Sequence, residues 1–153
     1  MADDRALTKV LELRKKLEDD ERRKWAESLK QIEAFDAQLK RLEDFKKLYL
    51  KELAGQQGNN LSVQHYLAYQ GFIDRLNMTY ERQLKVMEDL KKRSEILRQQ
   101  YLTARQDRRI IESLLEKHRL AALKAQNKAE AKMNDEFVSA RQARLLIEQN
   151  KTL

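Results

Sequence analysis

The sequence has 153 residues, of which 37% are charged and 7% aromatic, with three glycines, no proline and no cysteine. This composition excludes a globular core of this length, and the lack of cysteine excludes a disulfide framework or a thiolate metal site. The net charge is +7. The amino terminus is polar and acidic and no run of about 18 apolar residues occurs, so we expect a soluble cytoplasmic protein without a signal peptide or membrane span.

The first predicted element is a helix from about Arg5 to about Ala54. Apolar residues recur in it at the a and d positions of a seven-residue repeat, which is typical of a coiled coil. These residues are Leu7, Leu11, Trp25, Ile32, Phe35, Leu39, Leu42, Tyr49 and Leu53. The repeat is weakest near the amino terminus, where Arg14, Glu18, Glu21 and Ser28 occupy a or d positions. Such a polar seam predicts local mobility, fraying or contact with polar loops of a partner.

The second predicted element is a turn over residues 55–61, the one place where glycine and asparagine cluster. Left-handed backbone conformations are favourable there, so we interpret the segment as the turn of a hairpin. Either Asn60 or Ser62 can cap the helix that follows.

The third predicted element is a helix over about residues 62–149. Between Tyr66 and Ala125 it has 18 a and d positions, and four of these are not apolar: Gln83, Ser94, Arg108 and His118. A steady 3.5-residue spacing favours a left-handed supercoil, because a straight helix would turn its apolar stripe away from the partner.

The expected fold is therefore all-α: a single elongated domain formed by a two-helix antiparallel coiled-coil hairpin of unequal helices, with helix two overhanging. A short turn predicts that facing residue numbers sum to about 119, which places Tyr49 near Gln70, Leu42 near Asn77 and Leu7 near Glu112. From about Leu115 the second helix then has no partner in its own chain. This tail is either frayed or reserved for another protein. We expect the isolated protein to be a monomer.

Two phenylalanines occupy g positions, where a coiled coil ordinarily carries solvated charge. Antiparallel pairing predicts that Phe45 and Phe72 lie side by side on one edge, near Leu42, Tyr49 and Leu76, with Gln38 and Gln83 at the margin. The rings either widen the core near the turn or form a partly exposed patch that anchors a protein interface.

The sequence has no phosphate-binding glycine loop and no nucleophile motif, and its two histidines are far apart. We expect no enzymatic activity, no cofactor and no metal. The stretch Lys91–Lys128 holds eleven basic against four acidic residues. It is compatible with a binder of nucleic acid or of a membrane surface, but acidic residues interrupt it, which favours a field that steers an acidic protein surface.

The start of the second helix carries the pattern Tyr-x-x-Tyr-Gln-x-Phe-Ile over residues 66–73. Together with the turn that precedes it, this pattern resembles the FliJ family of flagellar export proteins. The segment Lys132–Phe137 is similar to the Lys-Met-Asp-Glu-Phe element of that family with one residue inserted. The resemblance extends over nearly the whole chain.

The resemblance implies a cytoplasmic, non-enzymatic stalk of the flagellar type III export apparatus, peripherally associated with the inner face of the cell membrane. Its implied partners are a hexameric export ATPase, whose assembly it promotes, an export-gate membrane protein and, for some members, empty export chaperones. Nucleic acid and membrane insertion are not expected. The equivalent stalk of a virulence secretion system is the alternative.

The resemblance also implies two contact surfaces. The gate-binding residues would be Gln38, Leu42, Phe45, Tyr49, Phe72 and Leu76. The ATPase-binding residues would be Leu13, Arg14, Leu17, Glu18, Glu21 and Arg22. Thr79 and Gln83 depart from the family pattern at the margin of the gate-binding surface.

Overall fold

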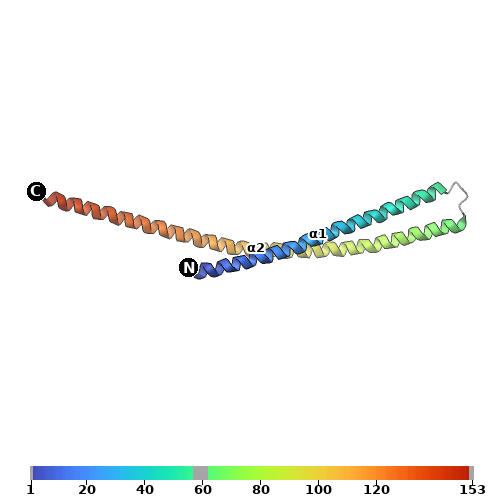
Figure 1. The fold of residues 1–153 in the computed structure, drawn as a ribbon, viewed down its shortest axis with the longest axis horizontal. Coiled ribbons are helices and arrows are strands. Elements are labelled where there is room, and N and C mark those ends of the chain that lie inside the picture. Colours follow the sequence, from blue (N-terminus) through green and yellow to red (C-terminus); the bar gives the residue numbers. More distant parts are fainter. Residues whose placement is uncertain (1, 57–61, 152–153) are drawn as a thin grey trace. The chain divides into compact units, whose positions relative to one another are not determined.

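The chain folds as two long helices, described by a computed structural model over residues 2–56 and 62–151. Helix α1 spans Ala2–Gln56 and α2 spans Val63–Lys151 (Figure 1). They pack against each other as a hairpin in which the second helix is longer, so the predicted all-α hairpin is confirmed. Residues 57–61 of the predicted turn, including the capping candidate Asn60, lie outside the described residues.

Packing divides the chain into two parts, one of residues 15–105 and one of residues 1–14 with 106–153. In residues 15–105, every a and d residue from 18 to 53 and from 69 to 104 is buried or half-buried. The most buried are Ser28, Leu39, Leu53, Ile73, Met87 and Ser94. The predicted seven-residue pattern is therefore confirmed here. Burial of this stripe is the main source of stability for a helix pair.

The predicted register is wrong by about three residues. Ser28 and Ser94 face each other with their hydroxyl oxygens 3.1 Å apart, and their numbers sum to 122. An antiparallel coiled coil forms core layers by pairing a d residue such as Ser28 with an a residue such as Ser94. A sum of about 119 places no d residue opposite an a residue. The predicted pairings of Tyr49 with Gln70 and of Leu42 with Asn77 are therefore displaced.

An a residue also faces a d residue where the amino terminus of α1 packs on α2. Asp4 Oδ1 lies 2.8 Å from His118 Nδ1, again with numbers that sum to 122, so the pairing of Leu7 with Glu112 is displaced as well. Arg14 Nη1 lies 3.5 Å from Asp107 Oδ2. Beyond His118 every described residue, from 119 to 151, is exposed, and Met133 and Phe137 are each 70% exposed. In Figure 1 this stretch is coloured orange to red.

Ser62 caps the amino terminus of α2. Its hydroxyl oxygen accepts a hydrogen bond from the backbone N–H of His65 at 3.2 Å, and its carbonyl accepts one from the N–H of Tyr66 at 3.1 Å. One of the two predicted caps is thus confirmed. In residues 2–56 and 62–151, no helix is long and apolar enough to cross a membrane.

Candidate protein interface

Four aromatic residues form a cluster near the turn, which we call the aromatic tip: Phe45, Tyr49, Tyr69 and Phe72. The rings of Phe45 and Phe72 lie 6.3 Å apart edge to face, as their heptad positions predict. Tyr49 stacks on Phe72 at 4.5 Å and contacts Tyr69 at 5.8 Å. Phe72 and Tyr49 are half-buried, whereas Phe45 is 49% exposed. The Phe72 ring therefore widens the core, whereas the Phe45 ring remains partly at the surface.

A groove of about 410 Å³, the tip groove, opens beside Phe45. Its lining consists of Phe35, Gln38, Leu39, Arg41, Leu42, Phe45 and Gln83. Three of the six predicted gate-binding residues line it, namely Gln38, Leu42 and Phe45. A mostly apolar groove with an exposed aromatic ring at its margin is suited to receive an apolar side chain of another protein.

Sequence reasoning missed part of this lining. The heptad positions of Phe35 and Leu39 predict only that they lie in the core, although core residues also line a groove where the facing side chains leave space. No feature of the sequence pattern indicates that Arg41 lines the groove. Gln83, which departs from the family pattern, nevertheless lines the groove. Leu76 is half-buried on α2, and the Thr79 hydroxyl donates to the carbonyl of Arg75 in its own helix at 2.9 Å.

The predicted ATPase-binding residues lie on α1 and differ in exposure. Leu13 is 56% exposed and Leu17 is 43% exposed. Arg22 is also exposed, and its Nη2 lies 2.9 Å from Asp19 Oδ1. Arg14 is half-buried and pairs with Asp107. The structure thus leaves the two leucines and Arg22 at the surface.

Two half-buried glutamates complete that set. Glu18 and Glu21 sit at the helix seam, as their a and d positions require. Glu21 Oε1 lies 3.3 Å from Lys24 Nζ, while Oε2 is buried and makes no hydrogen bond within the described part of the chain. An unsatisfied buried carboxylate oxygen is unfavourable, so this turn of the seam is less stable than its neighbours.

The weak stretch of the seam is held by an aromatic pair and a hydroxyl pair. The rings of Trp25 and Tyr101 stack at 5.6 Å with an interplanar angle of 23°. One turn along, the Ser28 hydroxyl donates to the carbonyl of Trp25 at 2.6 Å and lies within hydrogen-bond distance of Ser94. Both serines are buried, with 7% and 6% exposed. The polar layer is therefore satisfied internally.

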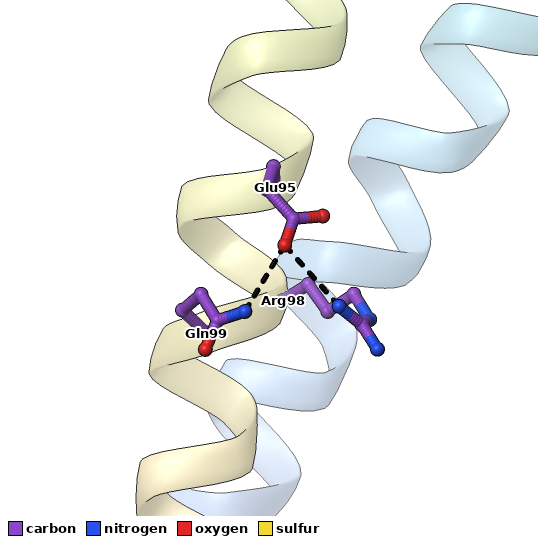
Figure 2. Close-up of polar contacts among 3 residues, drawn as sticks. All are labelled: Glu95, Arg98 and Gln99. Atoms are coloured by element: carbon purple, nitrogen blue, oxygen red, sulfur yellow. Dashed lines mark hydrogen bonds and ion pairs between the residues drawn. The ribbon is translucent and has the colours of Figure 1, made fainter.

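Two carboxylates of α2, Glu95 and Glu116, are matched within the helix. Glu95 accepts hydrogen bonds from Gln99 at 3.0 Å and from Arg98 at 3.2 Å (Figure 2). The bond from Gln99, with the charge and hydrogen bond of Arg98, lowers the pKa of Glu95 from 4.5. The hydrogen bond from Arg119 lowers the pKa of Glu116 in the same way, and that carboxylate raises the pKa of Arg119.

The histidines contact different residues. His65 Nδ1 lies 2.6 Å from the Ser62 hydroxyl, whereas His118 pairs with Asp4. Within residues 2–56 and 62–151, no three His, Asp or Glu side chains gather in a group that could hold a metal ion. The aromatic tip and the tip groove described above are suited to binding another protein through exposed apolar side chains.

A family model for the flagellar FliJ protein matches residues 3–145. The chain belongs to the FliJ family. The resemblance noted at residues 66–73 is thus confirmed over nearly the whole length. Comparisons with curated proteins and with solved structures returned no match.

FliJ family membership makes the chain a non-enzymatic component of the flagellar type III export apparatus. The matched family is flagellar, which favours the flagellar interpretation over a virulence stalk or a nucleic-acid binder. The prediction that the chain is not an enzyme is confirmed by this membership.

Proposed function

We propose that this chain is a stalk-like coiled coil that links the hexameric export ATPase to the export-gate membrane protein at the inner face of the cell membrane. In this role it promotes assembly of the ATPase ring and escorts empty export chaperones. Support comes from the family match over residues 3–145 and from the two surfaces on the helix pair. The observation that carries the proposal is the exposed ring of Phe45 beside the tip groove.

The gate contact uses the aromatic tip and the tip groove. An aromatic ring that is half-exposed at a groove margin can bury the rest of its surface in a partner, and such rings are frequent anchors of protein interfaces. Phe45 meets this description, since its ring rests against Tyr49 at 5.2 Å and is thereby held in place before binding. A pre-organised anchor loses little conformational entropy on binding.

The ATPase contact uses the amino-terminal part of α1. Leu13 and Leu17 supply exposed apolar surface, and Arg22 supplies charge beside them. Because the neighbouring seam contains glutamates instead of aliphatic residues, this stretch is held less firmly than the rest of α1. That property suits a helix which must adapt to the loops of a ring.

Phe45→Ala tests the gate contact. In the full-length chain it removes the exposed ring, and we expect binding to the cytoplasmic domain of the export-gate protein to weaken about 5- to 30-fold, equivalent to about 1 to 2 kcal/mol. Helical content by circular dichroism should be unchanged. Phe72→Ala is a less clean probe, because the Phe72 ring stacks on Tyr49 in the seam.

Leu50→Ala is the matched control. Leu50 is 43% exposed on the same helix but occupies an e position, on the edge opposite Phe45 and the tip groove. Its truncation should leave gate binding and swimming of a complemented strain unchanged. If Phe45→Ala binds the gate as tightly as the unaltered chain, or if Leu50→Ala weakens binding equally, the aromatic tip is not the anchor.

A further inference from the structure

A second groove lies between α1 and α2 in residues 15–105, farther from the turn than the tip groove. It has a volume of about 400 Å³ and is lined by Arg23, Lys24, Glu27, Ser28, Gln31, Arg93 and Leu97. We call it the basic groove. Three of its lining residues are cations, contributed by both helices, and the described lining contains one carboxylate, Glu27.

Like charges meet across this groove. Lys24 of α1 and Arg93 of α2 both occupy g positions, and in an antiparallel pair g residues face g residues. These positions ordinarily carry opposite charges that pair between the helices, because like charges there destabilise the association. Two cations at facing g positions are therefore unfavourable for the stability of the helix pair. Departures of this kind are expected at functional sites.

The two arginines of the groove are also unmatched on their own helices. Neither Arg23 nor Arg93 makes a hydrogen bond or ion pair within the described part of the chain, whereas Lys24 reaches Glu21 at 3.3 Å. By contrast, Arg98 of α2 is paired with Glu95 (Figure 2). The guanidinium groups of the basic groove are therefore free to receive a ligand.

We propose that the basic groove is a docking site for a carboxylate-rich segment of a partner protein. Two guanidinium groups at the margins of a groove can each take a carboxylate with two parallel hydrogen bonds. Half-buried Leu97 adds apolar contact for the stem of an acidic side chain. The volume admits a few side chains of a protein segment.

Nucleic acid fits the groove less well. Binding of single strands relies on aromatic side chains on which bases stack, and the described lining contains no aromatic residue. Glu27 would repel a continuous line of phosphates, whereas a protein segment can place an acidic residue on one side of Glu27 and a neutral one opposite it.

The basic groove opens on the same edge of the helix pair as the tip groove. Lys24 and Gln31 occupy the g position of α1, as do Gln38 and Phe45. A partner seated at the tip could extend an acidic segment into the basic groove. Docking in the basic groove does not require that the same protein occupies the tip groove, because it depends only on the charges that line the basic groove.

The experiment measures binding of a synthetic glutamate-rich peptide to the full-length chain by fluorescence anisotropy at low ionic strength. Arg93→Glu should weaken binding by about tenfold or more. Lys91→Glu is the control, since it makes the same charge change two residues away at an e position, on the opposite edge, and should change binding less than about twofold. Glu27→Gln should tighten binding, because it removes the one repelling carboxylate.

The proposal is overturned if Lys91→Glu weakens binding as much as Arg93→Glu, since only the net charge would then matter. It is also overturned if single-stranded DNA or phosphatidylserine vesicles bind more tightly than the peptide and depend on Arg93, because the groove would then be a phosphate site. Phe45→Ala should leave peptide binding unchanged. A failure at the tip and a failure at the basic groove are thus distinguished.

Discussion

At the scale of single residues, some charges in this chain are matched on their own helix and others have no partner within the described residues. Glu95 and Glu116 are matched by neighbours three or four residues away, as is usual on a solvated helix face. Arg23 and Arg93 make no hydrogen bond or ion pair within the described residues. The matched charges stabilise the helix, whereas the charges without a partner are available to another protein.

A pH dependence follows from the matched carboxylates. The pKa values of Glu95 and Glu116 are lowered by their partners, so the folded chain holds these protons less tightly than the unfolded chain does. Their stabilising contribution is present above the ordinary value of 4.5 and is lost as the pH falls through the lowered folded values. In a carboxyl NMR titration, Arg119→Gln should raise the pKa of Glu116.

The control in the same titration is Glu95, whose partners are Gln99 and Arg98 and whose midpoint should not move in Arg119→Gln. An unchanged midpoint for Glu116 would contradict the assigned cause, namely the hydrogen bonds at 2.7 and 3.0 Å from the guanidinium.

At the scale of elements, the buried hydroxyl layer specifies how α1 and α2 pair. Ser28 and Ser94 satisfy each other only when these two positions face. A shift of one helix by a heptad would place Ser28 opposite Met87 or Tyr101. The buried hydrogen bond between the Ser28 and Ser94 hydroxyls would then be lost, which is unfavourable. A single polar layer can thus select one register at some cost in stability, as polar a-position residues do in other coiled coils.

A double-mutant cycle tests this layer. Ser94→Ala should lower the free energy of unfolding by about 1 kcal/mol, because a Ser28–Ser94 hydrogen bond is lost in a buried place. In Ser28→Ala/Ser94→Ala the loss should be smaller than the sum of the two single losses. Urea unfolding provides the measurement. Strictly additive losses would mean that the two hydroxyls do not interact.

At the scale of the whole molecule, α2 continues well beyond the residues that α1 covers. Every described residue from 119 to 151 is exposed, including the apolar side chains of Met133, Phe137 and Leu146. Among the described residues nothing packs on this stripe. An uncovered helix of this length in water is held only by its own hydrogen bonds.

We therefore expect amide hydrogens of residues 119–151 to exchange with solvent much faster than those at the a and d positions of residues 15–105. Hydrogen–deuterium exchange with mass spectrometry on the isolated full-length chain measures both. The result should not depend on protein concentration. Slow exchange in residues 119–151 that becomes slower at higher concentration would indicate that another copy covers the stripe.

The sequence alone determined the architecture and much of the surface. A seven-residue apolar repeat on both sides of a glycine- and asparagine-rich break specifies two helices, their antiparallel pairing and the residues that face inward. It also predicted that Phe45 and Phe72 meet on one edge and that Ser62 is one of two possible caps. These features follow from the spacing of residues along the chain, which the sequence shows directly.

The tertiary structure decided the register and the grooves. A heptad pattern looks the same after a shift by seven residues, and the length of the turn does not restrict the shift closely, so the alignment depends on which side chains satisfy each other across the seam. Ser28 with Ser94 and Trp25 with Tyr101 provide that information. The two grooves arise where facing side chains leave space. The volume of each groove depends on how the side chains of both helices pack together, so the sequence of one helix does not determine it.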